Sequence, residues 1–458
     1  MSGPSNRVDR AALRAAIAAE MSLAREDLAS LVALRSVADP EVEPVEECRA
    51  AAAAVAELMR GCGLEPQVLD TPDSSQAVIA RPVPRGRPVV LLYSHYDVVP
   101  AGDPATWTSS PWTLTEREGR WYGRGAADCK GNFVAQLVAL RALRSVLGPD
   151  LASWPVAVAA VCEGSEEQSG GGLEALGRAH PELVTADVIL LQDTGNIAAG
   201  QPTLTTSLRG TGSVLVTVTT MRRPAHSGMF GGAAPDALQA LLTGLASLRS
   251  ADGETTIDGL PHDGTWDGAP FPADRFAADA ELVDGVAPLT GSGEVADLLW
   301  ARPAATVLAI DAPAVTGATA AVQGRARAVV NLRVPPGQDP AQARQLLTDH
   351  LRRHTPYGVV EVDPLSLGRP FRADVSGPGY LAMRRAMAES FGREAVLAGQ
   401  GGSIPLAVAL AELNPDAEIM LFGVEEPAAG IHGPDESVDP AELERTALAL
   451  ALFLTAPH

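Results

Sequence analysis

Lysine is almost absent from this chain of 458 residues, because Lys130 is the only lysine among 35 basic residues. The 56 acidic residues outnumber the basic ones and give a net charge of −21. This charge argues against nucleic acid or an anionic membrane as a partner, because both would repel the protein. A lone lysine in so arginine-rich a chain hints at a specific role for its ammonium group.

Paired cysteines and long apolar runs are also missing. The four cysteines (Cys48, Cys62, Cys129 and Cys162) form no C-x-x-C pair and no spacing typical of a disulfide framework. No apolar run approaches the ~18 residues of a membrane-spanning helix, and the amino-terminal segment has no apolar centre of the signal-peptide type. We therefore expect a cytoplasmic protein with reduced thiols and no membrane contact.

Four short apolar runs read as strands that are buried on both faces. They are "PVVLLY" (88–93), "PVAVAAV" (155–161), "DVILL" (187–191) and "EIMLF" (418–422). Helical patterns separate or flank them, at 8–37, 43–61, 132–147 and 440–454. This alternation predicts an α/β fold with a mostly parallel sheet and flanking helices.

A second pattern occupies the middle of the chain. From 208 to 366 the elements follow the order β-α-β-β-α-β, which is typical of a ferredoxin-like α+β domain. A polar, Gly- and Pro-rich insertion at 251–303 interrupts this order and is expected to form surface loops. Because the fourth apolar run lies beyond this block, we predict a domain at 208–366 inserted into one made of 1–207 and 367–458.

Polar side chains follow each of the four apolar runs. In open α/β sheets, ligands bind at the carboxyl ends of the strands. The candidates at these ends, together with an aspartate that precedes a predicted helix, are His95, Asp97, Asp128, Glu163, Glu166, Glu167, Asp193 and His432.

So many carboxylates at one sheet edge would repel one another unless cations neutralise them. Histidine together with carboxylate favours zinc, manganese or cobalt over calcium or magnesium. Five candidate ligands exceed one tetrahedral site, so we predict two metal ions that share a carboxylate. Such a pair of ions polarises a carbonyl for hydrolysis.

Each candidate taken alone has a plainer explanation. His95 could be a hydrogen-bonded structural histidine, Glu166 and Glu167 an acidic turn, and the two aspartates helix caps. The loops "RPAHSGMFGG" (223–232) and "GQGGSIPLA" (399–407) could likewise be an ordinary turn and a helix cap. Only the joint occurrence at successive strand ends favours a site.

The chain resembles the aminoacylase/carnosinase family of co-catalytic zinc metallopeptidases, and most of all its carnosinase-like dipeptidase branch. The motifs that carry the resemblance are "SHYDVVP", "GRGAADCKG", "EGSEEQSG", "LLQD", "HSGMFGG", "NLRVPPG", "GGSIP" and "IHGPDE", in this order. The resemblance implies a catalytic domain with two metal ions, usually zinc, and an inserted lid domain that forms a homodimer.

The resemblance also implies roles for single residues. One metal ion would bind His95 and Asp193, and the other Glu167 and His432, with Asp128 bridging the two ions. Asp97 would orient His95 and fix its tautomer. Glu166 would be the general base that takes a proton from the attacking water and passes it to the leaving amine.

Further roles concern the substrate. His226 would stabilise the oxyanion from the neighbouring subunit, and Arg333 would bind the free carboxylate of the substrate. Gly402 and Ser403 would line the same pocket. Lys130 lies within the motif of the bridging aspartate and would have a supporting structural role. The resemblance implies histidine at position 193 in relatives that hydrolyse carbamoyl groups and glutamate in aminoacylases and desuccinylases, so Asp193 fits the dipeptidase branch. The motif "IHGPDE" departs from the linker that usually follows this histidine in the family. The resemblance therefore assigns the metal ligand but not the residues of the pocket wall.

The sequence favours a dinuclear hydrolase that cleaves the amide bond of dipeptides or similar small substrates with a free carboxylate. An N-acyl amino acid deacylase or a pathway-specific amidohydrolase would share every metal residue. A binding protein on the same fold is disfavoured by the intact Glu166, and a cysteine hydrolase using Cys129 or Cys162 by the lack of a suitably placed histidine.

Overall fold

The four apolar runs form neighbouring strands in the computed structural model of this protein, which describes residues 9–83, 86–168 and 171–456. Strand β3 pairs in parallel with both β6 and β7, and β17 pairs in parallel with β7. Nearly all residues of these strands are buried, as expected where a sheet is covered on both faces. Their bounds are Val89–His95 (β3), Ala157–Glu163 (β6), Val188–Gln192 (β7) and Glu418–Phe422 (β17). The predicted mostly parallel sheet is confirmed.

Five further strands extend this sheet, in the order β1-β2-β6-β3-β7-β17-β8-β15, with β16 pairing with β8. The sequence analysis did not foresee them, because each has six residues or fewer and only β2 consists almost wholly of apolar residues. The added strands that pair along this path do so in antiparallel fashion. Their bounds are Pro66–Asp70 (β1), Gln76–Ala80 (β2), Thr203–Leu208 (β8), Phe371–Arg372 (β15) and Val396–Gln400 (β16).

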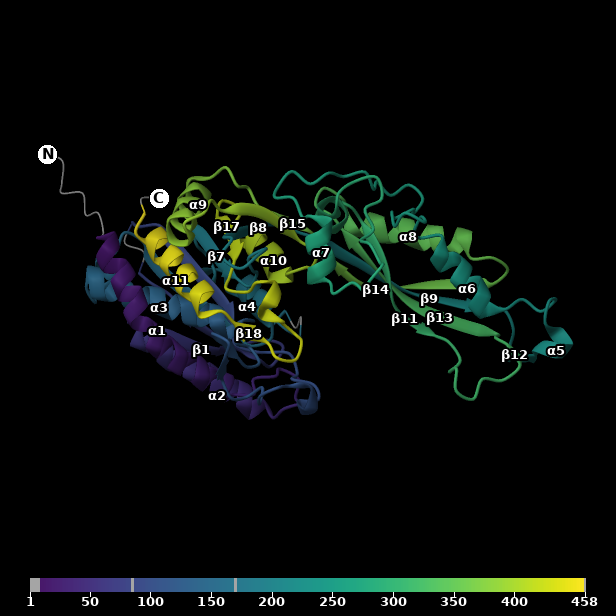
Figure 1. Cartoon of the computed structure of the whole chain (residues 1–458), viewed down its shortest axis with the longest axis horizontal. Coiled ribbons are helices and arrows are strands. Elements are labelled where there is room, and N and C mark those ends of the chain that lie inside the picture. Colours follow the sequence, from purple (N-terminus) through teal and green to yellow (C-terminus); the bar gives the residue numbers. More distant parts are fainter. Residues whose placement is uncertain (1–8, 84–85, 169–170, 457–458) are drawn as a thin grey trace. The chain divides into compact units, whose positions relative to one another are not determined.

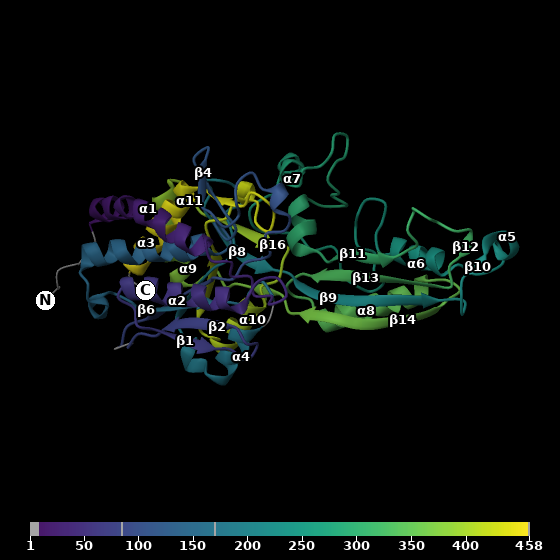
Figure 2. The same cartoon turned by 90° about the horizontal axis from the view of Figure 1, so that it is seen from below.

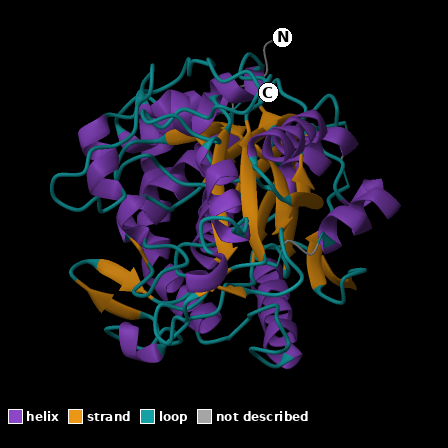
Figure 3. Ribbon diagram, turned by 90° about the vertical axis from the view of Figure 1, so that its right-hand side faces the viewer, coloured by secondary structure: helices purple, strands orange, loops and turns teal. Residues whose placement is uncertain are grey.

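Helices cover both faces of the sheet, as Figure 3 shows. Buried residues of α1, α2, α3, α9 and α11 form one apolar core with one face of the strands, and α4 and α10 lie on the other side (Figure 2). The bounds are Arg10–Val32 (α1), Val45–Gly61 (α2), Lys130–Leu147 (α3), Gly172–Ala179 (α4), Pro378–Phe391 (α9), Pro405–Leu413 (α10) and Pro440–Leu454 (α11). A small sheet of β4 (Thr115–Arg117), β5 (Arg120–Tyr122) and β18 (Ser437–Val438) completes this part of the chain.

The only lysine fixes the end of the first helix. Helix α1 ends at Val32, earlier than the predicted 37. The Nζ atom of buried Lys130 donates hydrogen bonds to the carbonyl oxygens of Leu31 and Leu34, both 2.9 Å long. Carbonyl groups at a helix end have no partner within the helix, and an ammonium group satisfies them well. Burial lowers the pKa of Lys130 to about 8.

The chain divides into two compact units. The first comprises Met1–Thr206, Ala373–Ala398 and Pro405–His458, and the second comprises Ser207–Arg372 and Gly399–Ile404. In the second unit the strands follow the order β11-β13-β9-β14, all antiparallel, with α6 and α8 packed on the sheet (Figure 1). This is the predicted ferredoxin-like arrangement. The bounds are Gly210–Thr219 (β9), Ala237–Ala246 (α6), Ala304–Asp311 (β11), Arg325–Val334 (β13), Pro340–His354 (α8) and Val359–Gly368 (β14).

The insertion at 251–303 is more ordered than the expected surface loops. It contains α7 (Ala273–Asp279) and a helical turn at Asp297–Ala301. Four aromatic side chains pack against one another within it: Trp266, Phe271, Phe276 and Trp300. Trp300 is 6% exposed. A local aromatic cluster therefore holds a segment whose polar composition suggested loops. Elsewhere in the second unit, β10 (Ala225–His226) pairs with β12 (Ala321–Val322) and precedes α5 (Ser227–Phe230).

No helix in the part of the chain that the structure describes is long and apolar enough to cross a membrane.

Candidate metal centre

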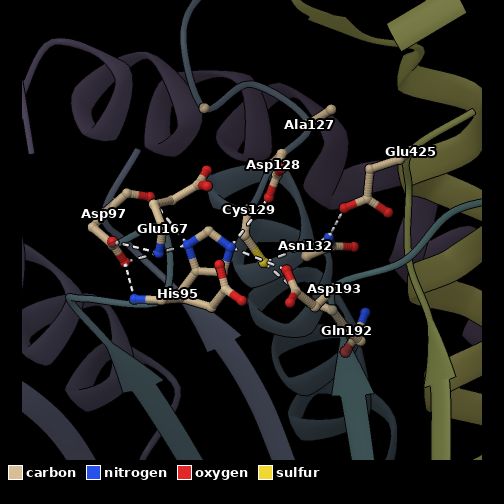
Figure 4. Close-up of polar contacts among 12 residues, drawn as sticks. His95, Asp97, Ala127, Asp128, Cys129, Asn132, Glu167, Gln192, Asp193 and Glu425 are labelled. Carbon is tan, nitrogen blue, oxygen red and sulfur yellow. Dashed lines mark hydrogen bonds and ion pairs between the residues drawn. The ribbon is translucent and has the colours of Figure 1, made fainter. Parts of the chain in front are cut away.

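The carboxyl ends of the central strands bring the first candidates together. His95 is the last residue of β3 and lies opposite Glu163, the last residue of β6. Asp193 directly follows β7, and Asp128 lies two residues before α3. In Figure 4 the side chains of His95, Asp128 and Asp193 point toward one another. Parallel pairing of adjacent strands is what carries these side chains to one edge of the sheet.

Two groups of possible ligands share Asp128. Nε2 of His95 lies 3.1 Å from Oδ1 of Asp128 and 3.0 Å from Oδ1 of Asp193. On the other side, Nε2 of His432 lies 3.1 Å from Oδ2 of Asp128 and 3.3 Å from Oε2 of Glu167. Each oxygen of Asp128 therefore faces a different histidine. The ligand atoms of each group lie within 4.8 Å of one another.

Cys129 belongs to the first of these groups by distance. Its thiol donates to the carbonyl oxygen of Gln192, 3.0 Å away, and burial raises the pKa of this thiol well above its usual value. A protonated thiol that is already hydrogen-bonded is a poor metal ligand, because metals bind the thiolate. The first group is therefore best described as two carboxylates and one imidazole.

The hydrogen bonds of His95 indicate which of its ring nitrogens could bind a cation. Its Nδ1 lies 3.0 Å from the carbonyl oxygen of Asp97, which can only accept, so Nδ1 carries the proton of a neutral ring. The lone pair of Nε2 then faces two carboxylate oxygens. An arrangement of this kind needs a cation between the acceptors or a second proton on the ring. The donor set of imidazole and carboxylate is one that zinc accepts.

A carboxylate that the sequence analysis left without a role holds the loop of Asp128. Glu436 is 1% exposed and accepts hydrogen bonds from the backbone N–H groups of Ala127 and Asp128, both 3.1 Å long. The same carboxylate pairs with the guanidinium of buried Arg124 at 2.6 Å. Glu436 is the last residue of the motif "IHGPDE", in which the sequence analysis had assigned a role only to His432. Its buried hydrogen bonds identify it as the group that positions Asp128.

Asp97 holds the acidic loop after β6. Its carboxylate accepts the backbone N–H groups of Glu166 and Glu167, at 3.2 and 3.0 Å. The nearest contact of Asp97 with His95 is through its carbonyl oxygen, and its carboxylate oxygen lies farther away, 3.4 Å from Nδ1. Asp97 therefore contacts both His95 and the loop that carries Glu166 and Glu167. The last two residues of the motif at 163–170 lie outside the described residues.

Charge crowding shifts the pKa values at this edge. Burial, followed by the charge of Asp193, raises the pKa of Glu166 to about 9. Burial raises the pKa of Asp193 to about 6. Hydrogen bonds to Asp128 and Glu167 raise the pKa of His432 to about 10. Burial alone would raise the pKa of Asp128, but hydrogen bonds from both histidines outweigh it and lower that pKa. If the metal ions are removed, the raised pKa values of Glu166 and His432 favour proton uptake at this edge.

The remaining predicted residues belong to the second unit. Arg333, near the end of β13, donates to the Oγ atom of Ser403 at 3.3 Å, and Ser403 donates to the carbonyl oxygen of Arg209 at 2.5 Å. Burial and the charge of Arg333 lower the pKa of Arg209 to about 10. Among the described residues, neither guanidinium pairs with a carboxylate. Gly402 lies in the same segment, whereas the Nδ1 atom of exposed His226 accepts the backbone N–H of Gly228.

We expect the chelated protein to lose stability as the pH rises from 6.5 to 9. Glu163, Glu166 and His432 have folded-state pKa values raised to about 8, 9 and 10. Between their unfolded and folded values the native state binds more protons than the unfolded state, so the free energy of unfolding falls as the pH rises. Between pH 6.5 and pH 9, the midpoint of thermal unfolding of the chelated protein should drop by several degrees. The zinc-loaded protein should show a much smaller drop over the same pH range. If the midpoint of the chelated protein stays constant or rises over this pH range, the prediction that these groups are protonated in the folded state is wrong.

Three comparisons place these observations among known proteins. The profile described as Peptidase family M20/M25/M40 matches residues 91–456. The chain is 46% identical over 397 residues to the cysteinylglycine-S-conjugate dipeptidase of Corynebacterium striatum, covering 86% of each sequence. It is 27% identical to the human Beta-Ala-His dipeptidase, over 80% of this chain and 74% of that protein. Among solved structures, the dipeptidase Dug1p of Saccharomyces cerevisiae superposes with a TM-score of 0.81 at 19% identity, covering 98% of this chain and 99% of the other.

Proposed function

Because this chain belongs to peptidase family M20/M25/M40, we propose that it is a dipeptidase that works with two divalent metal ions, zinc foremost. The observation that carries this proposal is the position of Asp128, whose two oxygens face two different histidine-containing groups. In the proposed assignment His95 and Asp193 hold one ion and Glu167 and His432 the other, with Asp128 between them. Manganese and cobalt suit the same donors.

Two bound ions would supply the Lewis acidity that polarises the scissile carbonyl and activates water. The chain supplies the proton transfer. Glu166 adjoins the ligand Glu167 but makes no contact with either histidine among the ion pairs of the described residues, which leaves its carboxylate available as a base. Asp97 fixes the backbone of Glu166 and so the reach of that carboxylate. We assign to Glu166 the transfer of the proton from the attacking water to the leaving amine.

Arg333 and Ser403 are proposed to bind the substrate's free carboxylate. The support is the guanidinium of Arg333, which has no carboxylate partner among the described residues, donates to the hydroxyl group of Ser403 and is close enough for its charge to lower the pKa of Arg209. Two neighbouring cations repel one another, and an anion between them would relieve this repulsion. A planar guanidinium also matches the two oxygens of a carboxylate. Arg209 was not foreseen, because it lies in no motif.

Cysteinylglycine and its S-conjugates are the substrates we propose to test first, on the strength of the 46% identical relative. The experiment is a screen of the zinc-loaded protein against cysteinylglycine, its S-conjugates, β-alanyl dipeptides and N-acyl amino acids. Faster hydrolysis of dipeptides would support the proposal. Preferred cleavage of N-acyl amino acids would favour a deacylase, and binding without turnover would favour a binding protein. The free state of all four cysteines supports a cytoplasmic location, which we include in the proposal.

A homodimer through the second unit is also part of the proposal. Strand β11 lies at one edge of the four-stranded sheet, and its residues from Thr306 to Asp311 are exposed. Three of them are large apolar residues: Val307, Leu308 and Ile310 are 43%, 62% and 40% exposed. An apolar edge strand of this kind tends to pair with another chain, and a two-fold axis would satisfy both copies at once.

We expect two inactive variants to restore activity when they form mixed dimers. If His226 acts on the site of the partner, a His226→Ala chain and a Glu166→Gln chain together hold one site with both groups intact. Each hybrid dimer should then show about half the wild-type rate, because one of its two sites is complete. Activity is measured after subunit exchange, with each variant alone as the control. If mass spectrometry confirms the exchange and no activity returns, His226 does not act across an interface.

A further inference from the structure

A second cluster of possible metal ligands lies in the second unit, apart from every residue assigned above. It contains Asp258, which follows α6 in the chain, and His350 and His354, which are one turn apart on α8 (Figure 1). Oδ2 of Asp258 lies 2.9 Å from Nε2 of His354 and 3.5 Å from Nδ1 of His350. The two imidazole rings lie side by side, with centroids 4.1 Å apart. Histidines at positions i and i+4 share one face of a helix.

Ser247 fixes the tautomer of His350. The Oγ–H of Ser247 donates to the carbonyl oxygen of Gly244 at 2.8 Å, so its oxygen is left to accept. That oxygen lies 2.9 Å from Nε2 of His350, which must therefore carry the proton. The lone pair of Nδ1 consequently points toward Asp258. A histidine whose remote nitrogen donates to a fixed acceptor is typical of metal ligands, because the bond orients the ring.

The ligand atoms of this cluster are held by nearby donors, which an incoming ion has to replace. His350 is 2% exposed, and its ring is neutral, because Nε2 carries the proton and Nδ1 accepts a hydrogen bond. The lone pair of Nδ1 thus faces a carboxylate oxygen. The backbone N–H of Asp258 donates to the same Nδ1 at 3.1 Å, and the half-exposed guanidinium of Arg353 contacts Oδ2. These two donors compete with any ion for the cluster.

We propose that Asp258, His350 and His354 bind one divalent transition-metal ion of the zinc class. Two imidazoles and one carboxylate form a donor set that zinc, cobalt and nickel accept and that magnesium and calcium disfavour. The ion takes the lone pair of Nδ1 in place of the N–H of Asp258, and Arg353, whose side chain is 63% exposed, turns into solvent. The ion then ties the segment after α6 to α8. Its role is structural and does not depend on the proposed peptidase activity.

The test compares zinc binding by the untagged full-length chain and by a His354→Ala variant. His354 is the last residue of α8 and is partly exposed, so its removal leaves the buried core intact. Both proteins are loaded with zinc alone, dialysed against metal-free buffer and analysed for bound zinc. We expect the variant to hold one ion fewer per chain than the wild type. A His180→Ala variant, which alters an exposed histidine outside the cluster, should match the wild type.

A second variant separates a built site from loose surface binding. Arg353→Ala removes the guanidinium that competes with the ion for Asp258. The cluster should therefore bind zinc about tenfold more tightly in a chelator competition. Equal zinc content in the wild type and His354→Ala would overturn the proposal. The proposal would also be overturned if both the wild type and Arg353→Ala lost the ion of this cluster on dialysis. Because the measurement is a difference between variants, it holds whatever number of ions the first centre binds.

Discussion

Replacing Glu166 with glutamine should reduce kcat by about 100- to 10,000-fold while leaving both metal ions bound. General acid–base catalysis by a positioned carboxylate contributes a factor of this size. Glutamine keeps the shape of glutamate but accepts no proton, and the backbone N–H of residue 166 still reaches Asp97. Hydrolysis rates of the zinc-loaded variant and its metal content by elemental analysis are the two measurements. Loss of turnover without loss of metal is the expected combination.

Two matched variants make this result specific. Glu167→Gln should lose metal together with activity, because Glu167 faces His432 and Asp128 in the second group of ligands. Glu174→Gln changes a carboxylate in the same small cavity as Glu166, where it pairs with Arg178, and should leave both quantities near the wild-type level. If Glu166→Gln lost a metal ion and Glu167→Gln did not, the roles of the two glutamates would be exchanged.

Amidation of the substrate's carboxylate should cost about 2–5 kcal/mol of transition-state binding, roughly 30- to 5,000-fold in kcat/KM. The reason is that Arg333 and Arg209 would then lose the anion that balances two neighbouring guanidinium groups. The measurement is the ratio of kcat/KM for a dipeptide and for its C-terminal amide. In an Arg333→Met variant this ratio should fall toward one, because only one of the two guanidinium groups that distinguish the substrates remains.

Arg327→Met is the control variant for the comparison of a dipeptide with its C-terminal amide. Arg327 lies on the same strand, β13, but pairs with Asp311 on the exposed side of the sheet. Its loss should leave the preference for the free carboxylate unchanged. Equal rates for a dipeptide and its amide in the wild type would remove Arg333 from carboxylate binding and with it the dipeptidase assignment. The metal centre in the first unit would be unaffected by that result.

The order of elements could be predicted because it depends on local patterns. The four central strands are continuous apolar runs, and a buried parallel strand requires this pattern wherever it occurs. The same holds for the ferredoxin-like order of the second unit, which alternation and helical periodicity reveal. The antiparallel strands β1 and β2 escaped notice because each has only five residues, with mixed burial in β1 and an almost fully buried run in β2, and so short a stretch carries little periodic signal.

The candidate ligands could also be predicted, because parallel strands bring their carboxyl ends to one edge of the sheet. His95 and Asp193 end adjacent strands, so their meeting follows from the order of apolar runs and the polar residue after each. Sequence alone therefore determined which side chains would gather and that their charges would call for cations.

The partners that hold these side chains in place were decided by the tertiary structure alone. Glu436 lies more than three hundred residues from Asp128 in the chain, and only the folded loop brings its carboxylate to the N–H groups of Ala127 and Asp128. Ser247 fixes the tautomer of His350 across a gap of 103 residues. A residue that ends a strand leaves a pattern in the sequence, whereas a hydrogen bond between distant loops leaves none, because it depends on distances that only packing sets.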